Sequence, residues 1–425
     1  MTKKDLIICL YGSTGDLAFR KLLPAISNLK LNNKLPEKTL IIALGRRAFS
    51  TDEYFDYINE HTNGHKITNL NSITEYYEMQ ILDENDYKSF KNELEKHCDG
   101  NTRVIHYLAV SSNMMIEVAN NISKTNIIQK NNLNQSLVFE KPFGEDYQTA
   151  HNINLNLLKN YHEDQIYRLD HYLGKDLINA IIDLRFKTNL LESALSPKKL
   201  VSIDIVAKEE DGILNRGAFY DQTGAVKDML QSHLLQVVSL LTMDKPKKLT
   251  SSSITNEKVK ALRKVEIQKN SIIFGQYSGY LEEENVASNS LTETMIKVSL
   301  NVKNKFKKVP INLLTGKKLD QKETYIKFNL KDGSSINLNI FPNKAISLKT
   351  HLLNEEIDAG YTFKNVDDEY ATLINAVMDF KKENFVRSDE IEVAWKICDY
   401  LLSHKSELTI YNKNNFWLNK KIITK

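Results

Sequence analysis

The stretch LIICLYGSTGDLAFRK, residues 6–21, joins an apolar run to a glycine turn and then to the first residues of a helix. An apolar run of this length is typical of a strand buried on both faces of a parallel sheet. Backbone N–H groups and the positive dipole end at the start of such a helix can bind a pyrophosphate. Gly12 and Gly15 leave room for it, because a Cβ atom would block the approach of phosphate oxygens. Since the full G-x-G-x-x-G motif is absent, a plain turn before a helix stays open as an alternative.

Outward from this stretch, strand-like and helix-like patterns alternate as far as about residue 170. This alternation indicates a parallel sheet covered by helices on both faces. We therefore expect an α/β domain with a Rossmann-like, doubly wound sheet over residues 1–172. The apolar runs lie at 6–11, 39–44, 103–110, 136–139 and 165–169, and the amphipathic stretches between them lie at 16–31, 83–97, 113–122 and 145–160.

The pattern changes after residue 172, where strands cluster without helices between them. Such clustering indicates an α+β domain with a large, mostly antiparallel sheet, which we expect over residues 173–425. The polar, Ser- and Lys-rich segment 245–270 is predicted to be a weakly structured connector. Predicted helices lie at 175–191, 224–242, 366–382 and 388–404, and predicted strands lie at 200–206, 294–302, 324–330, 335–340 and 345–350.

Composition and charge exclude several classes of protein. Hydrophobic residues make up 41% and charged residues 26% of the chain, as in ordinary globular proteins. A net charge of +3 gives no general surface for nucleic acid or membranes. The cysteines, Cys9, Cys98 and Cys398, have neither metal-ligand spacing nor a disulfide pattern, so we expect no metal site and a reducing compartment. The run at 6–11 is too short for a signal sequence or a membrane span, and the expected location is the cytoplasm.

Two basic residues, Arg46 and Arg47, follow the second predicted strand. An NAD site usually carries an acidic residue here for the ribose hydroxyls, whereas arginine accommodates a 2′-phosphate. The pair therefore favours NADP as the cofactor. A solvated basic loop is the alternative.

Two further motifs follow predicted strands of the same domain. EKPFG, residues 140–144, ends a strand near the place where a bound nicotinamide should lie, and Lys141 there could hold a hydroxyl or carboxamide oxygen. RLDHYLGKD, residues 168–176, gathers a carboxylate, an imidazole, a phenol and an ammonium group between Asp170 and Lys175. Such a cluster suits a sugar phosphate. The respective alternatives are a structural turn and a charged loop beside an apolar helix.

The predicted helix 224–242 has a polar stripe that includes Asp228 and an apolar opposite side. With 3.6 residues per turn, His233 lies at the border of this stripe, about 140° from Asp228. A histidine at such a border is more often a satisfied core residue than a base. Its chemistry therefore depends on the residues around it.

Taken together and in this order, GSTGDLAFRK, EKPFG, RLDHYLGK and DMLQSH resemble the motifs of the glucose-6-phosphate dehydrogenase family. The resemblance implies oxidation of β-D-glucose 6-phosphate at C1 to 6-phosphoglucono-δ-lactone with reduction of NADP, the first step of the oxidative pentose phosphate pathway. It also implies a homodimer formed through the second domain. The expected partners are thus the sugar phosphate and a second copy of the chain.

The same resemblance assigns roles to single residues. His233 would be the general base that removes the C1 hydroxyl proton, and Asp170 would orient the imidazole and stabilise the imidazolium. Pro142 is expected in a cis peptide bond. The expected substrate-binding residues are Lys141, His171, Tyr172, Lys175, Glu209, Asp228, Lys317 and Lys322. The expected cofactor-binding residues are Gly12, Ser13, Thr14, Gly15, Asp16, Leu17, Lys21, Arg46 and Lys141.

The chain departs from the family pattern at two places. Ser111 and Ser112 stand where members usually carry prolines, and Leu314 stands where arginine is usual. The chain is also shorter than typical members, so a second, structural NADP site is not expected. Two other functions stay open: a generic sugar oxidoreductase with a Glu-Lys-Pro motif, and a non-catalytic paralogue. The first lacks the segment 170–175, and the second would have little reason to keep both Asp170 and His233.

Overall fold

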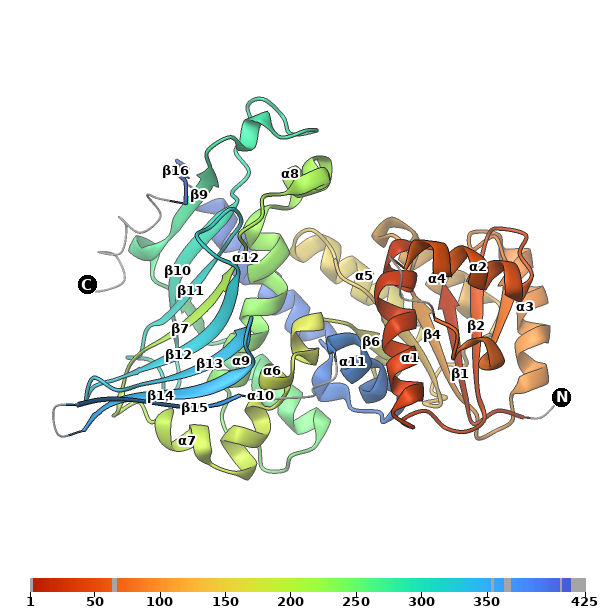
Figure 1. The fold of residues 1–425 in the computed structure, drawn as a ribbon, viewed down its shortest axis with the longest axis horizontal. Helices are drawn as coiled ribbons and strands as arrows, with labels where there is room; N and C mark the ends of the chain where they lie inside the picture. Colours follow the sequence, from red (N-terminus) through yellow and green to blue (C-terminus); the bar gives the residue numbers. More distant parts are fainter. Residues whose placement is uncertain (1–2, 63–66, 353–354, 363–367, 406, 414–425) are drawn as a thin grey trace. The chain divides into compact units, whose positions relative to one another are not determined.

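The computed structural model describes residues 3–62, 67–352, 355–362, 368–405 and 407–413 (Figure 1). Its contacts divide the chain into two compact units, each with its own sheet. The first unit comprises Met1–Gly144, Gln148–Gly174 and Asp367–Ser388, and the second comprises Glu145–Tyr147, Lys175–Val366 and Asp389–Lys425. The first unit therefore includes a segment from late in the chain.

The first unit is built on a six-stranded parallel sheet. Its strand order, β3-β2-β1-β4-β5-β6, is that of a doubly wound sheet and confirms the predicted fold class. All five predicted strands form. The sequence pattern does not predict the edge strand β3, because TEYYE contains no apolar run. The strands are β1 (Leu6–Tyr11), β2 (Thr39–Gly45), β3 (Thr74–Glu78), β4 (Arg103–Leu108), β5 (Gln135–Phe139) and β6 (Ile166–Arg168).

Helices cover both faces of this sheet. They are the π-helical turn η1 (Ala18–Leu22), α1 (Leu23–Leu31), α2 (Thr51–His61), α3 (Glu84–His97), α4 (Ser112–Lys124), α5 (Tyr147–Asn160) and α11 (Glu369–Met378). On one face, α1, α2 and α11 pack against Ile8 and Leu10, and on the other, α3, α4 and α5 pack against Ile7 and Cys9. Burial on both faces explains why β1 is apolar throughout.

Helix α11 comes late in the sequence but packs into the first unit beside α1 (Figure 1). Its residues Leu373 and Val377 belong to the same buried cluster as Ile26 of α1. The Arg103 side chain of β4 donates a hydrogen bond to Val377 O at 2.8 Å. A helix from the far end of the chain thus completes the cover of this sheet face.

The second unit is built on a ten-stranded sheet of mixed direction. Its strand order is β15-β14-β13-β12-β7-β11-β10-β9-β16, with β8 beside β10. Among the described strands of this second sheet, only β7–β11 and β9–β16 are parallel pairs, so the predicted mostly antiparallel sheet is confirmed. The strands are β7 (Leu200–Lys208), β8 (Val265–Ile267), β9 (Ile273–Tyr277), β10 (Met295–Val302), β11 (Ile311–Gly316), β12 (Glu323–Leu330), β13 (Ser335–Phe341), β14 (Ala345–Leu352), β15 (Glu355–Thr362) and β16 (Thr409–Tyr411).

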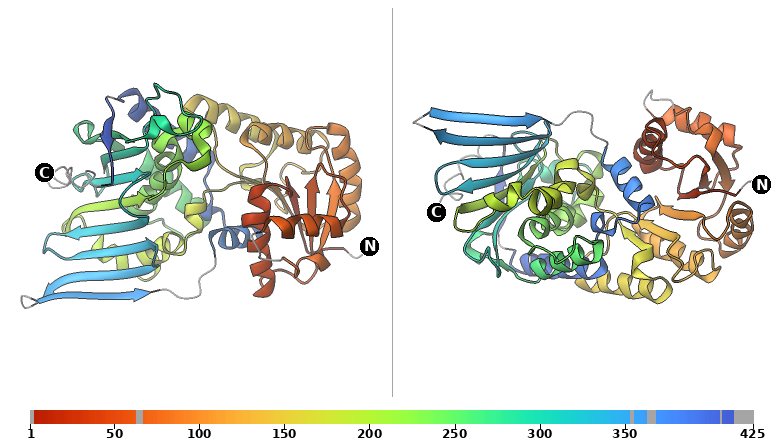
Figure 2. Two further views of the ribbon diagram at one scale, coloured as in Figure 1. Left: turned by 45° about the horizontal axis from the view of Figure 1, so that its top comes forward. Right: turned by 90° about the horizontal axis from the view of Figure 1, so that it is seen from below.

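The helices of this unit gather on one face of the sheet, as the green helices of Figure 2 show. They are α6 (Asp176–Asn179), the π-helical turn η5 (Asp183–Lys187), α7 (Leu190–Ala194), α8 (Gly217–Ala225), the π-helix η7 (Val226–Leu234), α9 (Leu235–Thr242), α10 (Ser251–Leu262) and α12 (Ser388–Ser403). The predicted helix 175–191 is therefore three short pieces. Nowhere in the described ranges does a helix have the length and apolar character needed to cross a membrane.

Segment 245–270 is not the weakly structured connector that its composition predicts. It contains α10, which the Thr250 side chain caps by accepting from Ser253 N–H, and then β8. Lys258 of α10 is fully buried and pairs with the fully buried Glu390 of α12 at 3.1 Å. The prediction is wrong because a lysine, taken alone, suggests an exposed surface. The partner that allows Lys258 to be buried lies far away in the sequence.

The predicted helix 224–242 consists of three segments, and its middle is π-helical. Gly224, with φ +65°, interrupts the helical path just before η7. In a π-helix each N–H bonds to the carbonyl five residues earlier, as Leu235 N–H does to Leu230 O. Asp228 and His233 are five residues apart and so lie one turn apart on η7. The predicted separation of about 140° is wrong, because it assumes 3.6 residues per turn.

Candidate functional site

The glycine turn after β1 has a backbone that only glycine adopts without strain. Gly12 has φ +78°, and an added Cβ atom would lie 2.6 Å from Ala109 O. The N–H groups of Gly12 and Ser13 both donate to Leu44 O of β2, at 3.1 and 3.0 Å. The turn therefore crosses the end of the sheet closely, with the start of η1 directly behind it.

The Ser13 side chain in this turn has a hydroxyl group that can still form a hydrogen bond. Its Oγ atom is fully buried and has no hydrogen-bond partner within the described chain. The hydroxyls of Tyr54 and Tyr57, both on α2, donate to the carbonyls of Ser13 and Thr14 at 3.3 and 3.4 Å. A fixed turn with a spare hydroxyl and the N–H groups of a helix start fits the pyrophosphate of a dinucleotide. The sequence pattern did not single out the two tyrosines.

Two arginines lie exposed beyond the end of β2. The Gln80 side chain donates to Arg46 O at 3.3 Å, and the Arg47 guanidinium lies 4.3 Å from the centroid of the Tyr57 ring. These contacts hold the loop, and both arginines are exposed residues. The position fits the predicted contact of Arg46 with a 2′-phosphate.

Three other predicted cofactor residues follow the turn on or beside η1. Asp16 is exposed and forms an ion pair with Arg20 at 2.8 Å. Leu17 packs in part against the apolar cluster beneath the sheet, and Lys21 is exposed. The geometry thus gives Asp16 and Leu17 local structural contacts, whereas Gly12 to Gly15 form the turn itself.

A carboxyl group that the sequence pattern left without a role lies at the end of β5. Glu140 accepts a hydrogen bond from the Tyr107 hydroxyl of β4 at 2.5 Å. Burial raises the pKa of Glu140 to about 7, the Tyr107 hydrogen bond and the Lys141 ammonium act in the opposite direction, and the Asp170 carboxylate raises it further. The Lys141–Pro142 peptide bond is cis, as expected.

The next strand, β6, leads into the DHYLGK segment. Asp170 is buried, its Oδ1 accepts from Tyr172 N–H at 3.0 Å, and its carbonyl accepts from Leu173 N–H at 2.9 Å. These bonds build the short 3₁₀ turn η4 (His171–Gly174), in which the His171 and Tyr172 rings meet edge to face at 5.2 Å. The turn sits close to α11, since a Cβ atom at Gly174 would lie 2.4 Å from a backbone oxygen there. One tight turn therefore positions three of the predicted side chains.

In the second unit, three predicted substrate residues come together from three elements. Lys317, after β11, is buried and its Nζ atom lies 2.7 Å from Glu209 Oε1 and 3.9 Å from Asp228 Oδ2. The same ammonium lies 5.1 Å from the centroid of the Tyr220 ring. Glu209 N–H donates to Gly316 O at 2.9 Å, which ties the end of β7 to this loop. A cation and two carboxylates in this arrangement can bind sugar hydroxyls.

Three further predicted residues of the second unit lie in different surroundings. His233 is fully buried in η7. Lys175 is half-buried and precedes α6 as its N-cap residue. Lys322 is exposed, and its ammonium lies 5.2 Å from the centroid of the Phe341 ring. Lys322 is therefore not part of the cluster around Lys317.

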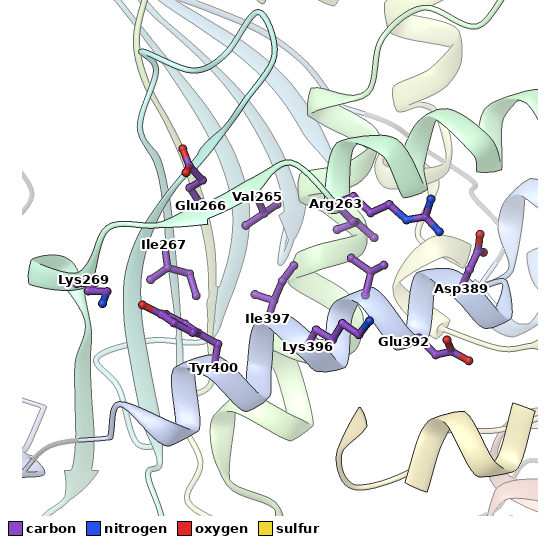
Figure 3. Close-up of a pocket in the computed structure, with 12 residues that line it drawn as sticks. Arg263, Val265, Glu266, Ile267, Lys269, Asp389, Glu392, Lys396, Ile397 and Tyr400 are labelled. Atoms are coloured by element: carbon purple, nitrogen blue, oxygen red, sulfur yellow. The ribbon is translucent and has the colours of Figure 1, made fainter. Parts of the chain in front are cut away.

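A separate cavity of 720 Å³ opens in the second unit between the end of α10, β8 and α12 (Figure 3). Val265 and Ile267 from β8 and Ile397 from α12 line it, together with the basic residues Arg263 and Lys396. None of its lining residues belongs to the predicted site. The cavity is therefore distinct from the residues assigned to catalysis and binding.

Comparison with known proteins adds an independent result. Residues 9–180 match the sequence model described as "Glucose-6-phosphate dehydrogenase, NAD binding domain", and residues 182–417 match "Glucose-6-phosphate dehydrogenase, C-terminal domain". The chain belongs to the glucose-6-phosphate dehydrogenase family. The matches cover both units and confirm the resemblance carried by the four motifs.

Relatives in this family are similar along nearly their whole length. The chain is 31% identical to glucose-6-phosphate 1-dehydrogenase of Buchnera aphidicola subsp. Schizaphis graminum, over 94% of this chain and 90% of that protein. A solved glucose-6-phosphate dehydrogenase in complex with its substrate glucose-6-phosphate superposes with a TM-score of 0.88 at 27% identity, over 96% and 94% of the two chains. Glucose-6-phosphate 1-dehydrogenase from Mycobacterium avium superposes with a TM-score of 0.85 at 27% identity, over 97% and 94%.

Proposed function

We propose that this protein is a glucose-6-phosphate 1-dehydrogenase, which oxidises β-D-glucose 6-phosphate at C1 to 6-phosphoglucono-δ-lactone and reduces NADP. The observation that carries the proposal is the match of nearly the whole chain to this family, in both of its domains. The reaction is the first step of the oxidative pentose phosphate pathway. Residues 1–172 then serve as the coenzyme domain, whose sheet α11 helps to cover, and the rest of residues 173–425 serve as the substrate and dimerisation domain.

The chemical step needs a base at the C1 hydroxyl, and we assign this role to His233. An imidazole can accept the proton of a hydroxyl group and later return it to water. We assign Asp170 to orient the imidazole and to stabilise the imidazolium that forms. Burial of both side chains supports these roles, because fixed charges act more strongly where water is excluded. The coenzyme, when bound, accepts the hydride that leaves C1.

The remaining predicted residues divide between the two ends of the sugar phosphate. His171, Tyr172 and Lys175 offer the cationic and hydroxyl donors that suit the phosphate dianion. Glu209 and Asp228 accept hydrogen bonds from sugar hydroxyls. Two lysines assist: Lys317 holds these carboxylates in place, and Lys322 adds positive charge on the approach to the phosphate. Lys141 serves both substrate and nicotinamide.

The coenzyme assignment rests on the glycine turn and on the exposed Arg46. Gly12, Ser13, Thr14 and Gly15 bind the pyrophosphate, and Arg46 binds the 2′-phosphate that distinguishes NADP from NAD. We also propose a cytoplasmic homodimer. The free thiols of all three cysteines support a reducing compartment.

Absorbance at the reduced-nicotinamide band, recorded with glucose 6-phosphate and either NADP or NAD, tests the proposal. We expect growth of the band with NADP and a much lower rate with unphosphorylated glucose. Equal rates on glucose and its phosphate would favour the generic sugar oxidoreductase instead. Coenzyme binding without any turnover would favour the non-catalytic paralogue.

A further inference from the structure

The Glu140 carboxyl group lies at the carboxyl end of the strands of the first sheet, where coenzymes bind in this type of fold. It directly follows β5, and β4 separates β5 from β1, which carries the glycine turn. In a doubly wound sheet, ligands lie outside the carboxyl ends of the strands. Glu140 therefore shares its edge of the sheet with the phosphate turn, and the position of β5 corresponds to the nicotinamide end.

Four groups of the first unit interact with this carboxyl group. The Tyr107 hydroxyl of β4 donates to it at 2.5 Å, and the Lys141 ammonium follows it in the chain. The Asp170 carboxylate after β6 and the Tyr370 phenol of α11 interact with it electrostatically. Burial is the largest influence on the pKa of Glu140 and raises it to about 7, against the lowering by the Tyr107 hydrogen bond and by the Lys141 ammonium.

We propose that Glu140 is the counter-ion of the oxidised nicotinamide ring: it gives its proton to solvent when NADP⁺ binds and takes a proton back once the ring is neutral. The proposal rests on the proposed function, because it needs the nicotinamide at this edge of the sheet. The ring of NADP⁺ carries a positive charge, and hydride transfer removes it. A carboxylate beside the ring stabilises the oxidised coenzyme and does little for the reduced one. The Tyr107 hydroxyl holds this carboxylate in place through its hydrogen bond.

Isothermal titration calorimetry measures the proton directly. NADP⁺ or NADPH is titrated into the whole protein at pH 7, in two buffers with different enthalpies of ionisation. Because burial raises the pKa of Glu140 to about 7 in the free protein, we expect NADP⁺ to release a measurable fraction of a proton more than NADPH at this pH. The 2′-phosphate also titrates near pH 6. It is common to both coenzymes, so the difference between them isolates the ring charge.

Two variants sharpen the test. Glu140→Gln keeps a hydrogen-bond acceptor for Tyr107 but cannot ionise, so the difference in proton release should vanish and the affinity ratio of NADP⁺ to NADPH should fall about three- to tenfold. Tyr107→Phe removes a donor that favours the ionised form. It should leave Glu140 more fully protonated at pH 7, so that NADP⁺ releases more protons than in the parent.

Glu78→Gln is the matched control, since Glu78 ends β3 at the same edge of the sheet and is exposed. It should keep the parent's proton release. Equal proton release by the two coenzymes in the parent, or an unchanged difference in Glu140→Gln, would overturn the counter-ion role while leaving coenzyme binding intact. Absence of binding heat with both coenzymes in the parent would refute the proposed function itself, and the counter-ion with it.

Discussion

His233 is fully buried on η7, one turn from Asp228, and is the proposed base. His233→Asn keeps a polar side chain but removes the proton acceptor. We expect kcat to fall by about 10²–10⁴-fold, with little change in KM for glucose 6-phosphate. Steady-state kinetics measure both, and a thermal melt shows whether the variant is folded. A kcat close to the parent's would contradict the assignment.

Lys317 is buried and its ammonium lies near the Glu209 and Asp228 carboxylates, so its loss removes this attraction. We expect Lys317→Met to lower the free energy of unfolding by about 2–4 kcal/mol and to raise KM for the sugar phosphate. The range is below that of a fully buried pair because the Glu209 side chain is 33% exposed. Lys322→Met, in the same loop but exposed, should change stability by less than about 0.5 kcal/mol. Equal urea midpoints for the two variants would show that the Lys317 cluster contributes nothing.

Lys382 gives stability a pH dependence of known sign. Its Nζ atom donates to Glu163 O at 3.2 Å, and burial lowers its pKa to about 7. An unfolded lysine has a pKa near 10.4, so above pH 7 the unfolded state binds more protons than the folded state. Stability therefore rises between pH 7 and about 8.5, by up to about 1 kcal/mol per pH unit. Urea unfolding of the parent should show this rise, and Lys382→Met should lack it. The same slope in both proteins would exclude Lys382 as its source.

At the residue scale, the sequence predicts side-chain chemistry better than it predicts partners. Gly12 is predicted because its requirement is local, and its positive φ agrees. Glu140 belongs to the motif EKPFG, yet its hydrogen-bond partner Tyr107 is 33 residues away on a neighbouring strand. No local sequence pattern predicts that these two residues meet. Lys317 is predicted to bind the substrate, but its ammonium lies 2.7 Å from the Glu209 carboxylate. Such pairs depend on the sheet order, which sequence periodicity does not contain.

At the scale of the elements, the turn into η7 is sensitive to substitution. A Cβ atom at Gly224 would lie 2.5 Å from Glu293 Oε1, the oxygen that accepts from Val226 N–H at 3.2 Å. With φ +65° as well, Gly224→Ala should cost about 1–3 kcal/mol and lower kcat, because η7 carries Asp228 and His233.

Gly100→Ala is the matched control for this turn, since its Cβ atom would meet no heavy atom within 4 Å. It should leave kcat unchanged and stability within about 1 kcal/mol. Denaturant unfolding and steady-state kinetics compare the two alanine variants. Equal stability and equal kcat in the two variants would show that the start of η7 does not require glycine at position 224.

Helices and strands differ in how far the sequence could predict them. Regular amphipathic stretches such as α3 and α4 are predicted within a few residues, because their apolar stripe is local. The π-helical register of η7 is not predictable from a 3.6-residue period, although it sets the relation of Asp228 to His233. Helix α10 is missed because its buried Lys258 reads as a surface residue until Glu390 is known to face it.

At the scale of the whole molecule, α11 makes the stability of the first sheet depend on a late segment. Leu373 is fully buried in the cluster with α1 and β1. Leu373→Ala should cost about 2–5 kcal/mol. We expect faster hydrogen exchange in β1 and β4, more than 260 residues earlier in the chain. Leu348→Ala, at an exposed leucine of β14, is the control and should leave these strands unchanged. Faster exchange confined to 367–388 would contradict the coupling.

The sequence predicts the class of both sheets but not how the chain is distributed between them. Alternating patterns before residue 172 and clustered strands after it suffice for the doubly wound and the mostly antiparallel sheet. The helix near 366–382 is predicted as well. That this helix belongs to the first unit is not predicted, because an amphipathic stripe does not show which sheet the helix covers.

This late helix also has a consequence for synthesis on the ribosome. All six strands of the first sheet leave the ribosome before α11 has been translated, with roughly 190 residues between Gly174 and Asp367. At about 5–20 residues per second, that interval lasts about ten to forty seconds. During this interval the nascent sheet exposes the apolar surface that α11 later covers. Chaperones that bind apolar surfaces therefore have time to act. The cellular yield of this protein therefore depends on what shields this surface before translation is complete.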